Sequence, residues 1–286
     1  GLEAAGRQEA LPWMRYNQFI NQVGVFILPS LLFALIAFGR KYMAQGMGFV
    51  TTGTPLQWML SVALMLASLP LVSNLITWNE GLSLPDTFRS VESWMRMQED
   101  NARALSDTFL ADTSLSGLML NLLIVAIMPA LGEELLFRGV LQGLLVRWTR
   151  SGHVGVLLSA LLFSALHLQF FGFFPRLFLG LVLGYAMLYS ADLRIPILMH
   201  LGNNALITII AWSYARQETS FDPISFGEAV PVWVLLPAAM ATLLCWWLLR
   251  RGNRRWCRRL HLCPGGGGQG GHRAHRLPHS QVGPEP

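Results

Sequence analysis

Charged residues are scarce in this sequence. Of its 286 residues only 13% are Asp, Glu, Lys or Arg, whereas 53% are hydrophobic and the mean hydropathy is +0.43. A soluble domain carries about 25% charged residues, so half that density cannot cover a water-facing surface of this size. The composition excludes an ordinary soluble enzyme and a disordered chain, and it is typical of a polytopic membrane protein.

Cysteine is also scarce, and excess positive charge is confined to one end. Three cysteines cannot form a disulfide framework. Residues 250–286 hold eight Arg and one Glu, so the rest of the chain has 13 basic and 15 acidic side chains, although the whole chain carries +5. The basic character therefore belongs to a Gly- and His-rich tail, which we expect to be disordered. We expect no nucleic-acid partner.

Long apolar runs recur along the chain. A membrane-spanning helix needs about 20 apolar residues, and the Leu, Ile, Val and Ala content favours helices over barrel strands. The predicted fold class is all-α: a polytopic membrane helix bundle of about seven transmembrane helices, or eight if the full protein is longer. The fifth run is the shortest. The runs cover residues 18–39, 56–78, 115–146, 154–174, 177–190, 195–214 and 229–249.

The polar stretch 79–113 separates the second and third runs. Its apolar residues recur at spacings of three, four or seven, which predicts an amphipathic helix lying on the membrane interface or packed on the bundle. We therefore divide the chain into four parts. These are N-terminal spans with the amphipathic helix (1–114), a membrane core (115–214), a last span (215–249) and the tail (250–286).

Basic residues in the loops predict the orientation. Arg40 with Lys41, Arg147 with Arg150, Arg194 and six Arg of 250–259 fall on one side of a seven-span chain. The positive-inside rule makes that side cytoplasmic. We expect a multi-pass protein of the lipid bilayer, in the cell (plasma or inner) membrane if the source is bacterial.

Three charges interrupt the third apolar run. Glu133, Glu134 and Arg138 follow a stretch without any charge, and an ionised side chain at mid-membrane costs roughly 2.5–3.5 kcal/mol even on lenient scales. Residues four apart share a helical face, so Arg138 should pair with Glu134. Glu133 is then left without a partner on its own helix, free to accept and release a proton. The alternative is that all three only tie helices together.

The fourth and sixth runs carry further polar side chains. Phe163 precedes His167 by four residues, and His200 precedes Asn204 by four, so each of these pairs lies on one helical face. Glu, His, His and Asn together could activate a water and stabilise an oxyanion. Glu133, His167 and His200 could instead hold Zn²⁺ with an open water position. The sequence leaves both mechanisms open.

These motifs have a known counterpart. The order E-E-x-x-x-R, F-x-x-x-H and H-x-x-x-N on successive apolar helices resembles the CPBP family, which joins CAAX prenyl proteases with bacteriocin-processing and Abi-type membrane proteins. The resemblance covers about residues 115–205 and implies an intramembrane endopeptidase. Its catalytic cavity would contain Glu133, His167, His200 and Asn204, with Glu134 and Arg138 completing the first motif.

The substrate stays open at this stage. A prenylated CAAX peptide is the best-known substrate of the family, and peptide maturation, leader processing and immunity to a secreted peptide are alternatives. Intramembrane Glu, Arg and His also mark ion pathways, so a proton- or ion-coupled transporter is a rival interpretation. A non-catalytic membrane scaffold of the same family is a second.

Overall fold

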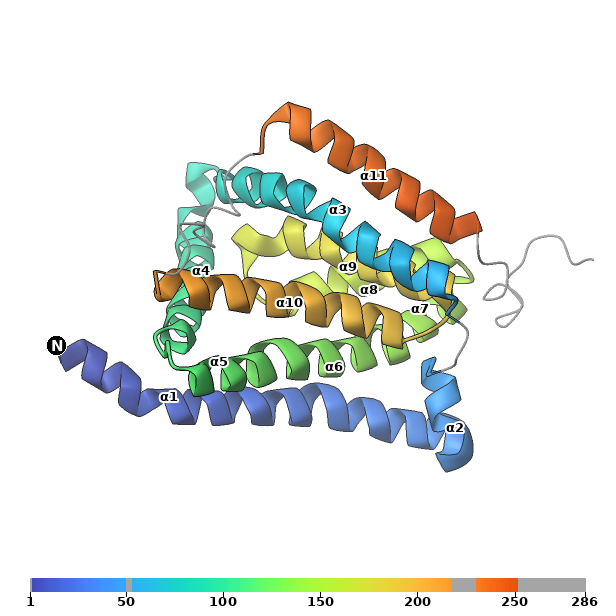
Figure 1. Ribbon diagram of the computed structural model, residues 1–286, viewed down its shortest axis with the longest axis horizontal. Coiled ribbons are helices and arrows are strands. Elements are labelled where there is room, and N and C mark those ends of the chain that lie inside the picture. Colours follow the sequence, from blue (N-terminus) through green and yellow to red (C-terminus); the bar gives the residue numbers. More distant parts are fainter. Residues whose placement is uncertain (1, 50–52, 218–229, 252–286) are drawn as a thin grey trace, which may run out of the picture.

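The computed structural model describes residues 2–49, 53–217 and 230–251, and every element that it assigns there is helical. The predicted disordered tail and most of loop 215–228 lie outside the described residues. Figure 1 shows a bundle whose long helices run between two ends, as a polytopic membrane protein requires. The fold class is confirmed.

The first and third spans are long and interrupted. The first span, residues 10–47, begins within α1 (Leu2–Asn21) and continues through the π-helical turn η1 (Gln22–Ile27) and α2 (Leu28–Met47). Residues 115–149 form one continuous helix of 35 residues. This helix consists of α5 (Leu115–Asn121), η3 (Leu122–Ile127), α6 (Met128–Glu134), η4 (Leu135–Leu141) and α7 (Gln142–Thr149), of which η3 and η4 are π-helical.

The remaining spans complete the bundle. They are α3 (Pro55–Glu80), α8 (Gly152–Ala165), α9 (Phe173–Ser190), α10 (Arg194–Ala215) and α11 (Val232–Arg251). Six of the described helical segments are long and apolar enough to cross a membrane, and α8 is an apolar helix of 14 residues. The chain is therefore a multi-pass integral membrane protein.

One predicted boundary is wrong. The fourth run was expected to extend to residue 174 and the fifth to begin at 177, which made the fifth the short one. Instead α8 ends at Ala165, a short 3-10 turn η5 (Phe170–Gly172) follows, and α9 begins at Phe173. Pro175 does not end a helix here, because the first turn of a helix tolerates proline.

The polar stretch forms the predicted helix. The 3-10 turn η2 (Asp86–Phe88) leads into α4 (Arg89–Leu110), which lies across one end of the bundle (Figure 1). Trp94 packs on Phe170 with ring centroids 5.2 Å apart, and the Arg96 guanidinium lies 4.4 Å from the Phe171 ring centre. The helix therefore packs on the bundle end, while Phe88 at its start stays exposed.

The other end of the bundle is the basic one. Figure 1 shows that α2, α7 and α11 finish at this end and that α3 and α10 begin there. Arg147, Arg194 and Arg250 lie in these terminal turns, and Lys41 lies in α2 two residues after the helix is interrupted at Gly39. The basic residues used to predict orientation thus gather at one end, which we call the basic end.

Two glycines hold α9 against α8. A Cβ added at Gly180 would lie 3.1 Å from Cβ of Ala160, and one at Gly184 would lie 2.9 Å from a methyl of Val156. Gly180 and Gly184 are four residues apart and form a G-x-x-x-G motif, at which the two backbones approach closely, as small residues allow in membrane helices. This contact fixes α9 behind the charged motif of the third span.

Candidate active site

The charged motif lies between π-helical turns. The turn η3 directly precedes α6, η4 directly follows Glu134, and η1 of the first span packs against α6. A π-helical turn widens the helix and is frequent at functional sites. Glu133 and Glu134 are the last two residues of the short regular segment between them.

Glu134 and Arg138 form a buried ion pair. Oε1 of Glu134 lies 2.7 Å from Nη1 of Arg138, and the two side chains are 0% and 1% exposed. Nη2 of Arg138 donates to the backbone oxygen of Gly180 at 3.0 Å. The pairing predicted from the spacing of four is therefore present, and it also ties the third span to α9.

Glu134 has a second partner on another helix. Its Oε1 lies 2.9 Å from Nδ1 of His200 in α10. A carboxylate only accepts hydrogen bonds, so this contact places a proton on Nδ1. Nε2 of His200 is thereby turned toward Glu133, whose Oε2 lies 4.0 Å away. A single water can bridge such a gap with a hydrogen bond to each side.

Glu133 has only a weak direct partner. Its Oε1 accepts from Nε2 of Gln22 at 3.4 Å, and the side chain is buried. No ion pair joins it to Arg138 among the described side chains, in agreement with their spacing of five. Glu133 is thus a buried carboxylate that faces a histidine and an amide rather than a fixed cation.

A cavity of about 300 Å³ collects four of the six predicted site residues. Glu133, His167, His200 and Asn204 all line it, together with Phe163. Glu134 and Arg138 do not line this cavity and contact His200 and α9 from behind. The Nδ1–H of His167 donates to the backbone oxygen of Phe163 at 2.8 Å. This bond leaves Nε2 of His167 as the nitrogen without a partner in the described residues.

Phe163 lies at the centre of these groups. Its ring centroid is 5.1 Å from that of His167 and 6.0 Å from that of His200. The Arg138 guanidinium lies 4.9 Å from the same centroid, at cation–π distance. One aromatic side chain therefore positions both histidines and the cation of the buried pair.

Two adjacent asparagines line the cavity from α10. Asn204 donates through Nδ2 to the backbone oxygen of Val125 at 3.3 Å, within the π-helical turn η3. Asn203 donates to Oδ1 of Asn204 at 3.2 Å. We expected only Asn204 to face the site. The structure adds Asn203 to the wall because the cavity is wide enough to reach both residues.

Three further polar side chains at the site were not predicted. Arg176 lines the cavity from the first turn of α9, where its Nη1 donates to the backbone oxygen of Gln169 at 3.1 Å. Arg176 falls between the predicted fourth and fifth runs and was not among the predicted site residues. Gln18 and Gln22 approach from the first span. Their spacing of four within an apolar stretch was a usable signal.

The three predicted metal ligands line one cavity but are not grouped closely enough to hold a metal ion as they are placed. Within the described ranges, no three His, Cys, Asp or Glu side chains form a group that could hold a metal ion. Glu133 and His200 face each other, but His167 does not complete a set of three. A catalytic zinc site has three protein ligands and an open water position, so this donor set does not fit one.

Comparison with known proteins agrees with the position of the site. Residues 115–206 match the model of the family described as type II CAAX prenyl endopeptidase, Rce1-like. Over these residues the chain is similar to the CAAX intramembrane proteases. The CAAX-protease segment contains every predicted site residue, from Glu133 to Asn204, and the family resemblance seen in the three motifs is confirmed.

A relative extends the similarity beyond this segment. An Escherichia coli protein named "uncharacterized 24.3 kDa protein" is 29% identical over 203 residues, covering 63% of this chain and 93% of the relative. No solved structure matches the chain. The family match supports a membrane protease of the CAAX type in general terms.

Proposed function

We propose that this protein is an intramembrane endopeptidase in which Glu133 and His200 activate a water that attacks a peptide carbonyl. The observation that carries the proposal is the pair of atoms Oε2 of Glu133 and Nε2 of His200, 4.0 Å apart on the wall of one cavity. The CAAX-protease family match over the same helices supports peptide-bond hydrolysis rather than transport.

The proposed reaction needs one proton acceptor and one stabilised oxygen. Glu133 takes a proton from the water, and the resulting hydroxide forms a bond to the carbonyl carbon. The carbonyl oxygen becomes an anion, for which the Asn204 amide and the Arg176 guanidinium are the available donors. When the C–N bond breaks, the leaving amine takes the proton back from Glu133.

Glu134 acts on the reaction through His200. Its carboxylate accepts from Nδ1–H, which fixes the imidazole and its tautomer, in the way that a buried carboxylate orients the histidine of a catalytic triad. Arg138 in turn fixes Glu134. Both are positioning residues in this proposal, since neither lines the cavity.

The substrate class follows from the family and from the bilayer. We propose a peptide or membrane-attached protein segment, with a prenylated CAAX peptide as the first probe because the matched family is described as prenyl endopeptidases. We also propose the cell membrane, inner or plasma, as the location for a bacterial source.

The test is cleavage by the purified full chain in nanodiscs. Prenylated and unprenylated fluorogenic peptides of one sequence are offered beside a diverse peptide library, and products are read by mass spectrometry. We expect at least one peptide to be cleaved by the wild type and not by Glu133→Gln. Cleavage that persists in Glu133→Gln would show that Glu133 is not the general base. If the folded wild type cleaves none of the peptides, the result would favour the alternative that the protein is a non-catalytic membrane scaffold.

A further inference from the structure

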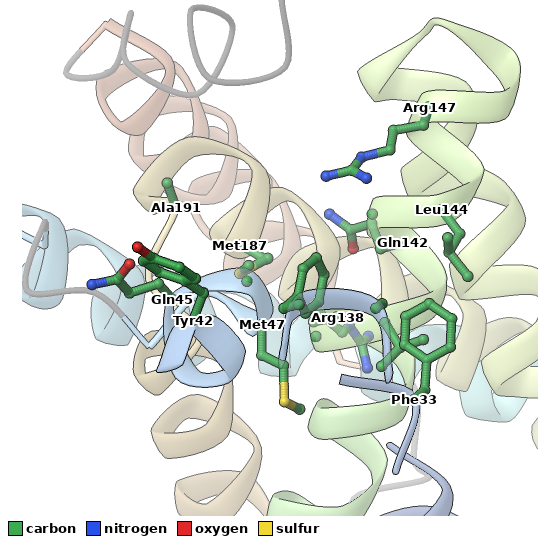
Figure 2. Close-up of a pocket in the computed structure, with 17 residues that line it drawn as sticks. Phe33, Tyr42, Gln45, Met47, Arg138, Gln142, Leu144, Arg147, Met187 and Ala191 are labelled. Carbon is green, nitrogen blue, oxygen red and sulfur yellow. The ribbon is translucent and has the colours of Figure 1, made fainter. Parts of the chain in front are cut away.

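A second cavity, of about 530 Å³, lies near the basic end of the bundle (Figure 2). One wall is apolar and aromatic and comes from α2, with Phe33, Phe38 and Tyr42. The facing wall comes from η4 and α7 and carries Arg138, Gln142 and Arg147. None of the 17 lining residues is Asp or Glu. The cavity is therefore apolar on one side and cationic on the other.

Glycines keep this space open. Gly39 in α2 has φ +70° and ψ 159°, a backbone region open essentially to glycine alone, and it turns the end of the helix back over the cavity. A Cβ added at Gly143 on the facing wall would meet no atom within 4 Å. On the α7 wall, Gly143 therefore leaves open a space that a larger side chain would fill.

The polar wall has unused hydrogen-bonding atoms. Nη1 of Arg138 pairs with Glu134 and Nη2 donates to the backbone oxygen of Gly180. Its buried Nε has no partner in the described residues. Gln142 donates to the backbone oxygen of Gly184, and its Oε1 is equally without a partner. Both side chains are at most 2% exposed. Because these two atoms are fully buried, they lie behind the cavity wall, and the charge that this wall exposes is that of Arg147.

Arg147 adds an exposed charge at the mouth. Figure 2 shows its guanidinium extending from α7 toward the space beside Gln142. Within the described chain, no carboxylate pairs with it. Arg147 lies in the last turn of a membrane span, at the depth where lipid headgroups lie. An anion at this position would meet Arg147 at the headgroup level and the aromatic wall of α2 at the level of the acyl chains.

We propose that this cavity binds an anionic phospholipid, with its headgroup phosphate at Arg147 and the start of an acyl chain along Phe33 and Phe38. Basic pockets between transmembrane helices recognise such headgroups. The volume suits a headgroup with part of a chain. The cavity shares no lining residue with the one that holds Glu133, and the proposed phosphate ligand, Arg147, has no part in the proposed protease reaction, so lipid binding can be tested apart from cleavage.

The test is lipid binding by the purified full chain, read by native mass spectrometry. Phosphatidylglycerol and phosphatidylcholine with identical acyl chains are titrated separately. We expect one saturable phosphatidylglycerol, bound at least about tenfold more tightly than phosphatidylcholine. Arg147→Gln should weaken phosphatidylglycerol binding by about tenfold, the loss of one charge-assisted contact. Arg150→Gln, at the same helix end but outside the cavity, is the matched control and should bind as the wild type does.

A second pair of variants tests whether the lipid occupies the volume of the cavity, whereas the first pair tests the charge of Arg147. Gly143→Phe should fill the cavity and abolish binding. Gly24→Phe is the control: a Cβ at Gly24 also meets no atom within 4 Å, but Gly24 lies outside this cavity, so binding should be unchanged. An excess of inorganic phosphate should not displace the lipid, because phosphate lacks the acyl chain. Equal binding of the two lipids, equal effects of Arg147→Gln and Arg150→Gln, or displacement by phosphate alone would each overturn the proposal.

Discussion

Glu134 contacts His200 through the same oxygen that pairs with Arg138. Oε1 is 2.9 Å from Nδ1 of His200 and 2.7 Å from Nη1 of Arg138. One buried oxygen thus connects the third span, which carries both glutamates, to α10, which carries the histidine. The adjacent Glu133 takes no part in this chain and faces the cavity. Two neighbouring carboxylates therefore have different environments and should respond differently to substitution.

The two glutamates give the first prediction. Glu133→Gln should abolish cleavage with little change in stability, because an amide keeps the shape and cannot accept the proton. Glu134→Gln should destabilise the protein by about 3–5 kcal/mol, because it leaves Arg138 buried without its counter-charge. Thermal unfolding monitored by tryptophan fluorescence, beside peptide turnover, separates the two effects. Wild-type turnover in Glu133→Gln would show that another group is the base.

The second prediction concerns metal removal. If Glu133 and His200 act directly on water, incubation with a chelator followed by buffer exchange should leave turnover unchanged. The reason is that the described side chains offer no group of three metal ligands. Metal content by mass spectrometry should be measured on the same sample. A loss of turnover that Zn²⁺ restores would instead support the alternative in which Glu133, His167 and His200 hold a metal.

The outcome for the site shows what helix geometry can and cannot predict. The pairing of Glu134 with Arg138 is local, so their spacing of four was enough to predict it. The contact between Glu134 and His200 joins residues 66 positions apart, and only packing of two spans creates it. The carbonyl of Val125 accepts from Asn204 within a π-helical turn, which the pattern of apolar residues does not reveal.

The fold, like the site, was predicted in part from local sequence patterns. Apolar runs predicted the spans, because length and composition decide whether a helix can cross a bilayer. The predicted boundary between the fourth and fifth runs is misplaced: those runs leave residues 175 and 176 between them, whereas both lie in the first turn of α9. That error also moved Arg176 out of the predicted site. A charged residue within a run of phenylalanines was the signal that should have kept it there.

The third prediction is a pH dependence at the end of the bundle. Hydrogen bonds from Ser114 and Arg15 hold the pKa of Asp112 below its usual value, since they favour the charged carboxylate. The lowered pKa in the folded state means that Asp112 stabilises the protein above the unfolded pKa of about 4. This contribution is lost as the pH falls through the folded value.

Asp112→Asn is the variant that tests this. It should be less stable than the wild type at neutral pH, and the difference should narrow as the pH falls below about 4. Thermal unfolding of both proteins across that range is the measurement. Asp86→Asn is the matched control, because Asp86 is highly exposed and pairs only with Arg89. A constant difference between Asp112→Asn and wild type at every pH would refute the electrostatic origin.

The last prediction separates the two asparagines of α10. Asn204 uses one amide hydrogen on Val125, so its second remains for a developing oxyanion. Asn204→Ala should lower the single-turnover rate by ~10²–10³, the cost of losing one oxyanion donor, with substrate binding changed far less. Asn203→Ala removes only a bond that steadies Asn204 and should have a much smaller effect. A larger loss in Asn203→Ala would mean that Asn203 presents the donor, and it would require a different role for His200 on the same helix.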